Sequence, residues 1–329
     1  MTIPHVVSEM AASCPSHLAA VDLEAETRVN YEQLHALMLK AAVAFISNGI
    51  SKGDRVAIWA PNSLNWVVAC LGLQAAGAVL VPLNTRFKGA EAQFILNKSR
   101  ARILIVADHF LGVSYSDMLA DLELPHLERI VKIGSKHQST GDWDEFVAGG
   151  SPQVLEKAHQ SLEDLSADDV SDIIFTSGTT GDPKGVITCH GQNVQTYRQW
   201  AQAVGLRSSD RYLILWPFFH CSGYKSGWLA SFIAGATIYP EPVLDIPRLR
   251  RTVEAEGITV MPGPPNLFQT LLADTEQESK KLPVRLAITG ASSVPPSLIE
   301  AMRNELGIES VLAGYGLTET CGTVTMTDM

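Results

Sequence analysis

Basic residues are few in the 329-residue sequence, and they form no basic stripe or long run. The 25 Lys and Arg residues are outnumbered by 35 Asp and Glu residues, which gives a formal net charge of −10 at pH 7. Proteins that bind nucleic acid usually carry a basic patch, so the sequence argues against a nucleic acid partner. Because the overall charge repels anions, an anionic ligand would have to be held by local donors.

Cysteine is also scarce, and no two cysteines form a Cys-x-x-Cys pair. An odd number without such pairs argues against a disulfide framework and against a zinc ribbon. Free thiols are typical of a reducing compartment, so we expect a cytoplasmic protein. The N-terminus lacks a basic segment and a long apolar run, and no signal peptide is expected. The cysteines are Cys14, Cys70, Cys189, Cys221 and Cys321.

One uncharged stretch, residues 66–83, has the length of a short membrane span. Gly77 and Pro82 interrupt it, and a spanning helix would need a longer continuous apolar run. The pattern predicts instead a buried helix that ends at Gly77, followed by a buried strand over 79–81. We therefore expect no transmembrane segment.

Strand-like and helix-like segments alternate along almost the whole chain, and 46% of the residues are hydrophobic. Such alternation predicts an α/β fold with mostly parallel sheets covered by helices, and the number of segments suggests two sheets. A helix is expected over 31–48, where Asn30 and Gln33 can form a capping box. Helices are also expected over 63–76 and 90–97. The other expected strands are 18–23 and 27–30 as a hairpin, then 56–59, 103–106, 172–175, 212–215, 236–238, 258–261, 286–289 and 310–312.

Two further expectations concern organisation. Residues 134–168 are polar and show no clear period, which indicates a surface excursion at a subdomain boundary. The first sheet is expected within residues 50–190, and the second within residues 1–49 plus 191–329. Residues 314–320 have the composition of a site loop, and no helix or strand pattern is evident after them.

The strongest motif is the glycine-rich segment that follows the expected strand 172–175. Glycines allow tight turns and close approach to a ligand, while hydroxyls and exposed N–H groups can bind phosphate oxygens. Lys184 adds a positive charge. The spacing does not match a Walker A loop, which excludes a kinase-like P-loop ATPase; the alternative is a flexible surface loop. The segment comprises Thr176, Ser177, Gly178, Thr179, Thr180, Gly181, Asp182, Pro183 and Lys184.

This segment resembles the phosphate-binding loop of the AMP-forming acyl-CoA synthetases, within the adenylate-forming superfamily. Residues 315–319, Tyr-Gly-Leu-Thr-Glu, resemble the second signature of that family. The resemblance implies that Tyr315 stacks on adenine, Thr318 contacts the α-phosphate, and Glu319 binds Mg²⁺, with Thr176 as a second metal ligand. A carboxylate among phosphate groups would repel them unless a hard cation lay between.

Small residues follow the expected strand 286–289 and recur before the second signature. Small residues at the carboxyl end of a strand leave room for a flat base in an α/β crevice, although an ordinary βα turn explains them as well. The resemblance implies that these residues enclose adenosine. The small residues are Gly290, Ala291, Ser292, Ala313, Gly314 and Gly316, and the resemblance adds the aromatic Tyr315 to this enclosure.

The segment 216–223 resembles the Phe-His-x-x-Gly segment beside the family's acyl pocket. The resemblance implies that His220 gates the pocket or orients the substrate carboxylate; the alternative is a satisfied core histidine. Tyr224, Lys225 and Trp228 are also expected to line this pocket, unless Trp228 is core and Lys225 is solvated. Adjacent residues of an extended segment point opposite ways, which argues against a dyad of His220 with Cys221.

Together these motifs imply an enzyme that activates a carboxylic acid with ATP and Mg²⁺ and then transfers the acyl group to coenzyme A. The residues expected to act in catalysis are Lys184, His220, Thr318 and Glu319. Longer stretches such as 56–62 and 81–86 are similar to ligases that attach coenzyme A to a steroid-derived indane-dione propionate. The alternatives are a fatty-acid or aryl-acid ligase and a non-catalytic nucleotide-binding remnant. The motifs do not fix the oligomeric state.

The resemblance covers the whole chain, but family members continue well beyond the position of Glu319. They add the rest of a small β-barrel subdomain, an Asp that binds ribose, a hinge, and a mobile C-terminal domain with a catalytic Lys. The sequence has no counterpart of these parts, so residues 1–329 are interpreted as an N-terminal AMP-binding domain. We expect this chain alone to be impaired or inactive.

Overall fold

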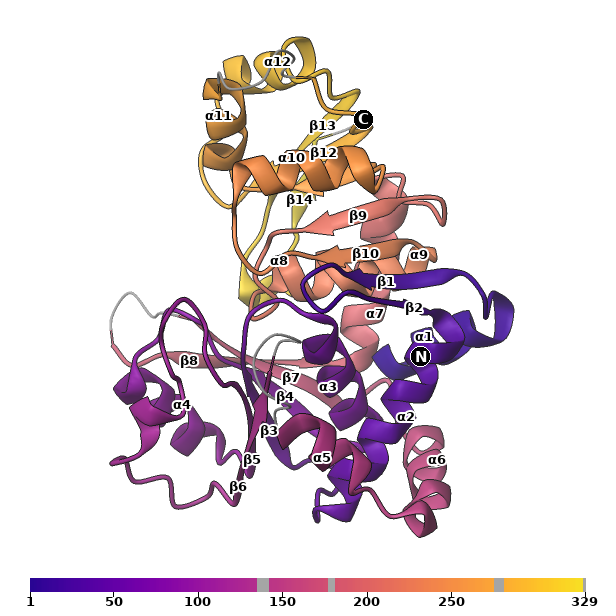
Figure 1. Ribbon diagram of the computed structural model, residues 1–329, viewed down its shortest axis with the longest axis vertical. Helices are drawn as coiled ribbons and strands as arrows, with labels where there is room; N and C mark the ends of the chain where they lie inside the picture. The colour runs from indigo at the N-terminus through magenta and orange to yellow at the C-terminus, as the bar shows by residue number, and fades with distance from the viewer. Residues whose placement is uncertain (135–141, 177–180, 275–280, 328–329) are drawn as a thin grey trace.

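The computed structural model describes residues 1–134, 142–176, 181–274 and 281–327, and the chain forms two β-sheets with helices packed around them (Figure 1). The eight-stranded sheet lies in the upper part of Figure 1 with α10, α11 and α12, and the six-stranded sheet lies in the lower part. Neither sheet closes into a barrel among these residues. The predicted fold class, with two parallel-rich sheets covered by helices, is confirmed.

The six-stranded sheet has the order β6-β5-β3-β4-β7-β8 and is parallel except for the β7–β8 hairpin. The central strands are continuous apolar runs, as expected where helices cover both faces of a parallel sheet. The strands are β3 (Arg55–Trp59), β4 (Val79–Pro82), β5 (Ile103–Ala107), β6 (Arg129–Ile133), β7 (Val170–Thr176) and β8 (Lys184–Cys189).

The eight-stranded sheet has the order β14-β13-β12-β11-β9-β10-β1-β2. Its central pairs are parallel, whereas β2 and β14 pair antiparallel at the two edges. The strands are β1 (Leu18–Asp22), β2 (Thr27–Asn30), β9 (Arg211–Ile214), β10 (Thr237–Pro240), β11 (Val260–Pro262), β12 (Leu286–Gly290), β13 (Ser310–Tyr315) and β14 (Thr325–Met326). The strands of the six-stranded sheet all lie within residues 50–190, and those of the eight-stranded sheet lie outside this range. The division of the chain into two subdomains at residues 50 and 190 stays a prediction.

Local sequence signals explain where several helices begin. At α2, the Asn30 Oδ1 accepts from the Gln33 N–H at 2.8 Å and the Gln33 Oε1 accepts from the Asn30 N–H at 2.9 Å, which confirms the capping box. The longer helices are α1 (Ile3–Ser13), α2 (Tyr31–Ser47), α3 (Leu64–Ala75), α4 (Gly89–Ser99), α5 (Asp142–Ala148), α6 (Leu155–Glu163), α7 (His190–Ala203), α10 (Ile246–Ala255), α11 (Pro265–Ala273) and α12 (Pro296–Asn304).

The uncharged stretch forms a buried helix and a strand, as predicted. Helix α3 packs against α2, α1 and β4, and the Ser63 Oγ accepts from the Trp66 N–H at its start. Among the residues that the structure describes, no helix is both long and apolar enough to cross a membrane.

The prediction for residues 134–168 was wrong over its described part. Residues 142–163 contain α5 and α6, and Trp143, Phe146 and Leu162 are buried against the main core. The ring centroids of Phe146 and Phe45 lie 5.1 Å apart. The few apolar residues sit at helical spacing, but the polar majority around them hid this period. The short strand β14, after the expected site loop, was also missed.

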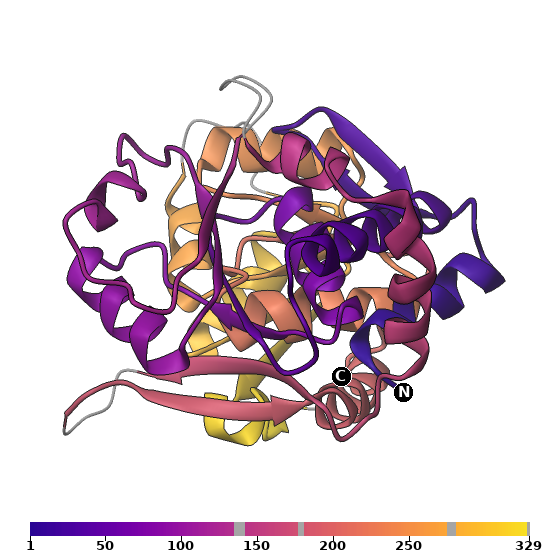
Figure 2. The same cartoon turned by 90° about the horizontal axis from the view of Figure 1, so that it is seen from below.

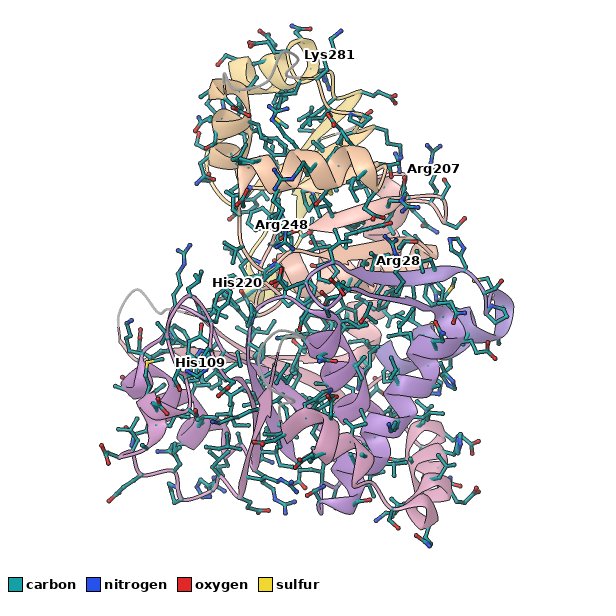
Figure 3. The ribbon with its side chains drawn as sticks, viewed as in Figure 1. Arg28, His109, Arg207, His220, Arg248 and Lys281 are labelled. Atoms are coloured by element: carbon teal, nitrogen blue, oxygen red, sulfur yellow. The ribbon has the colours of Figure 1, made fainter. Side chains whose placement is uncertain are left out.

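A buried acid lies where β10 ends. Glu241 is 3% exposed, and its carboxylate lies 3.1 Å from the Arg248 guanidinium, which also contacts Glu24 at 2.6 Å. Figure 3 shows Arg248 at the level where the two sheets meet. Burial raises the pKa of Glu241 to about 7, against the opposing effect of Arg248 and with further raising by Glu24, Asp22 and Asp245.

We expect Glu241→Gln to change how the free energy of unfolding depends on pH. In the folded chain Glu241 keeps its proton up to about pH 7, whereas in the unfolded chain it loses the proton near its ordinary pKa of 4.5. The folded state therefore binds more protons between these two pH values, and the free energy of unfolding falls as the pH rises from one to the other. The native chain should lose up to about 3 kcal/mol relative to the Gln variant between pH 5 and pH 8. Denaturant unfolding at both pH values measures this, and parallel pH profiles would contradict it.

Candidate active site

The residues of the second signature form a closed turn after β13. The Gly322 N–H donates to the Leu317 carbonyl at 2.9 Å, and the Val324 N–H donates to the Tyr315 carbonyl at 2.8 Å. A Cβ added at Gly316 would lie 1.5 Å from the Gly322 carbonyl oxygen, so only glycine permits this close approach. The turn leaves Tyr315 61% exposed.

The turn brings Glu319 to the end of a strand from the other sheet. Strand β7 ends at Thr176, whose Oγ1 lies 3.5 Å from the Glu319 Oε1 as donor to acceptor. Lys184 is the partner of Thr176 in the antiparallel β7–β8 ladder, and its side chain is exposed. Figures 1 and 2 show the C-terminal turn, in yellow, beside the β7–β8 hairpin. The Thr176 hydroxyl and the Glu319 carboxylate therefore meet at the end of β7, and Lys184 lies opposite Thr176 on the neighbouring strand.

Part of the glycine-rich loop can also be placed. Gly181 and Asp182 are exposed, and Pro183 is half-buried just before β8. The loop expected to bind phosphate therefore leaves the sheet at Thr176 and returns at Lys184. The expected phosphate ligands Ser177, Gly178, Thr179 and Thr180 lie outside the described residues.

The small residues expected to enclose adenosine lie side by side. Strands β12 and β13 are parallel neighbours, with Gly290 opposite Gly314. A Cβ at Gly290, where φ is +156°, would lie 2.3 Å from the Gly314 carbonyl oxygen. Ala291 has a φ of +63°, which is rare for a residue with a Cβ, and it is exposed together with Ser292. Ala313, at the end of the same pair of strands, is half-buried.

A cavity of about 100 Å³ lies beside these strand ends. Polar groups line it on two sides: Ser222 and Ser226 from one segment, and Thr289 from β12. Thr289 is 2% exposed, and its Oγ1 has no hydrogen-bond partner among the described residues. The other lining residues are Trp200, Tyr212, Trp216, Pro262, Ile288, Gly290, Ala291, Gly314, Tyr315, Gly316, Gly322, Thr323 and Met326.

His220 is not part of the cavity lining. It is exposed at the start of the short helix α8 (Cys221–Gly223), and its ring centroid lies 4.5 Å from that of Phe219. Figure 3 shows it at the junction of the two sheets. Desolvation by surrounding atoms, and then the charge of Arg86, lower the pKa of His220, so the imidazole is neutral at pH 7. Cys221 is buried, which agrees with the argument against a dyad.

The prediction that Tyr224, Lys225 and Trp228 line the acyl pocket was wrong. All three are fully buried in or beside the core, and none lines the cavity. They belong to η3 (Tyr224–Leu229), a π-helical turn whose other face presents Ser226 to the cavity. Trp228 is core, but Lys225 is not solvated, because its Nζ lies 3.0 Å from the buried Asp172 carboxylate.

Asn62 is a positioning residue that sequence reasoning missed. It lies after β3 of the six-stranded sheet and is 6% exposed. Its Nδ2 donates to the Trp216 carbonyl at 2.9 Å, and its Oδ1 accepts from the Phe218 N–H at 2.8 Å. One side chain thus anchors the segment that leads to His220. Its place in a Pro-Asn pair after a buried strand is the only sequence signal.

Thr176 and Glu319 fit the requirements of a magnesium site. Mg²⁺ prefers oxygen ligands, and it usually keeps several water molecules or phosphate oxygens around it. No group of three or more His, Cys, Asp or Glu side chains that could hold a metal occurs in the described ranges. The protein could therefore supply a hydroxyl and a carboxylate, with the remaining ligands from a nucleotide and water.

Polar side chains at the ends of strands, where two sheets meet, are typical of a nucleotide-binding site in an α/β protein. The family model for AMP-binding enzymes matches residues 7–329, and the chain belongs to this family. The predicted family is confirmed.

The similar proteins include ligases with a defined acid. The 3-[(3aS,4S,7aS)-7a-methyl-1,5-dioxo-octahydro-1H-inden-4-yl]propanoyl:CoA ligase of Rhodococcus jostii is 40% identical over 97% of this chain, and its Mycobacterium tuberculosis counterpart is 41% identical over 99%. The chain spans 63% and 64% of their lengths. The N-terminal domain of FACL13 from Mycobacterium tuberculosis, solved with an inhibitor, has a TM-score of 0.87 and 29% identity, and the match covers 99% of this chain and 78% of that one.

We expect Gly316→Ala to weaken binding of Mg·ATP by at least about tenfold, because the turn that carries Glu319 must open to admit a Cβ. Isothermal titration calorimetry on this chain measures the change. Gly149→Ala is the control, since it adds a Cβ 3.1 Å from its nearest neighbour and lies after α5, outside the site. Unchanged affinity in the Gly316 variant would contradict the role given to the turn.

Proposed function

We propose that this chain is the AMP-binding part of an acyl-CoA synthetase. The carboxylate of an acid attacks the α-phosphorus of ATP, pyrophosphate leaves, and an acyl adenylate forms. The thiol of coenzyme A then attacks the acyl carbon, loses its proton, and AMP leaves. The observation that carries this proposal is the 3.5 Å approach of Thr176 and Glu319, which come from different sheets and from the two signature segments.

The first step brings two anions together, so the site should act by positioning and by neutralising charge. We assign phosphate binding to the loop from Thr176 to Lys184, and contact with the α-phosphate to Thr318. A bound Mg²⁺ would lower the repulsion between phosphate oxygens and the Glu319 carboxylate. The strand ends at Gly290 and Gly314 supply the flat, small-residue surface for adenosine.

The family supports the use of ATP, whereas Mg²⁺, coenzyme A and the cytoplasmic location stay predictions. For His220, which is exposed and whose lowered pKa leaves it neutral at pH 7, we keep the predicted role of donating a hydrogen bond to the substrate carboxylate.

For the acid, we propose a compact, oxygenated group such as the indane-dione propionate of the similar ligases. The Thr289 hydroxyl is buried and has no hydrogen-bond partner among the described residues, so it can donate to a ketone oxygen. A plain alkyl chain offers no acceptor and would leave this buried hydroxyl unpaired. The sequence identity of 40% to 41% supports the same choice.

Glu319→Gln and Lys184→Ala should each lower carboxylate-dependent ATP–pyrophosphate exchange by about 10²- to 10³-fold, the usual effect of losing one preorganised group. Because the chain spans 63% of the Rhodococcus relative, exchange is measured in this chain and in a chimera that adds the remaining C-terminal region of that relative.

The controls are Glu300→Gln and Lys157→Ala, which change exposed side chains on α12 and α6. Exchange at the unsubstituted rate in both site variants would refute the assignments. ATP binding without any exchange in the chimera would favour the non-catalytic nucleotide-binding alternative.

The chimera should prefer the indane-dione propionate to a long-chain fatty acid and to an aryl acid, measured as exchange rates at equal concentrations. Thr289→Val keeps the shape of the side chain but removes the donor, and it should reduce the preference by about tenfold. A higher rate with the long-chain fatty acid would contradict the proposed substrate, but it would leave the proposed reaction intact.

A further inference from the structure

A fully buried ion pair lies in the core near the candidate active site. Asp172 in β7 and Lys225 in η3 are both 0% exposed, and the Lys225 Nζ lies 3.0 Å from the Asp172 Oδ1. The pair connects the two halves of the fold. Asp172 lies in β7 of the six-stranded sheet, whereas Lys225 lies in η3, which follows β9 of the eight-stranded sheet. The neighbouring Asp172 raises the pKa of Lys225 against the opposing effect of burial, so the amine is charged.

Neutral donors complete the surroundings of the Asp172 carboxylate. The Thr188 hydroxyl donates to Oδ1 at 2.7 Å, and the Asn193 Nδ2 donates to Oδ2 at 2.8 Å. The Ser171 hydroxyl lies 2.7 Å from Oδ2. A buried pair adds little stability over a well-packed apolar pair, because desolvation offsets the attraction. Its hydrogen bonds do fix the directions of the groups around it.

Two members of this cluster, Asn193 and Lys225, contact the turn that carries Glu319. The Asn193 Oδ1 accepts from the Cys321 thiol at 2.9 Å, and the Tyr197 hydroxyl donates to the Cys321 carbonyl at 2.8 Å. The Lys225 Nζ also lies 3.9 Å from the Cys321 Sγ.

The cluster therefore bonds to the two chain segments that carry the candidate metal ligands. Asp172 lies on the same strand as Thr176, four residues earlier, and Cys321 follows Glu319 by two residues. A short strand and a closed turn are stiff over such distances, so the separation of Thr176 and Glu319 depends on how the cluster joins them.

We propose that Cys321 and Asn193 are positioning residues that hold Glu319 opposite Thr176 by tying the turn to the buried Asp172–Lys225 pair. They need no contact with the nucleotide. Their effect is on Mg²⁺-dependent binding, because the metal requires both oxygen ligands at once. This inference rests on the proposed nucleotide site.

The test compares Cys321→Ala with Cys321→Ser in the 329-residue chain, by calorimetric titration with ATP in the presence of Mg²⁺ and in the presence of EDTA. The Ala variant lacks the donor, and its Kd for ATP with Mg²⁺ should rise about tenfold, the effect of one hydrogen bond. Its Kd with EDTA should stay unchanged. The Ser variant keeps a donor and should bind within about twofold of the native chain.

Cys14→Ala is the matched control, because the Cys14 thiol donates to the Met10 carbonyl in α1 at 3.4 Å and lies outside the candidate site. The second variant is Asn193→Ala, which removes the acceptor from the buried side. In that background the Cys321→Ala substitution should add almost nothing to the change in Kd, as expected when two residues act through one contact.

Several results would overturn the inference: Mg²⁺-dependent binding unchanged in Cys321→Ala and Asn193→Ala, Ser acting like Ala, or additive effects. An equal loss with and without Mg²⁺ would also overturn it, since that indicates general destabilisation. If the native chain itself shows no Mg²⁺-dependent binding of ATP, the proposed function fails first, and the two failures are thus distinguished.

Discussion

The whole account depends on a meeting of two strand ends. Strand β7, which lies between β4 and the edge strand β8, ends where the glycine-rich loop begins, and β13 of the other sheet leads into the turn that holds Glu319. Each segment alone is an ordinary loop after a strand. Only their convergence places a hydroxyl and a carboxylate 3.5 Å apart, where a hard cation can join protein oxygens to phosphate oxygens.

This convergence also answers an electrostatic difficulty. The chain carries a net charge of −10, yet its proposed substrates are polyanions. Attraction must therefore be local, and we assign it to the exposed Lys184 and to a cation bound at the Glu319 carboxylate. The buried Lys225 contributes nothing to this attraction, because its charge is compensated by Asp172.

Sequence reasoning found the features that short patterns encode. Apolar runs predicted the strands, and the pair Asn30 and Gln33 predicted the helix cap. Glycine-rich motifs after strands predicted the site segments. It missed features that depend on distant partners. The sequence around Lys225 does not indicate a buried ion pair, because its partner Asp172 lies far away in sequence. The role of Asn62 likewise depends on a distant partner, the Trp216 carbonyl. Helices α5 and α6 were missed for another reason: too few apolar residues mark their buried faces.

The most direct test of the shared metal site is a crystal structure of this chain grown with a non-hydrolysable ATP analogue and Mn²⁺, whose anomalous scattering locates the metal. The account predicts an anomalous peak between the Thr176 hydroxyl and the Glu319 carboxylate, with phosphate oxygens completing the coordination. A nucleotide bound with its metal away from both residues would contradict it.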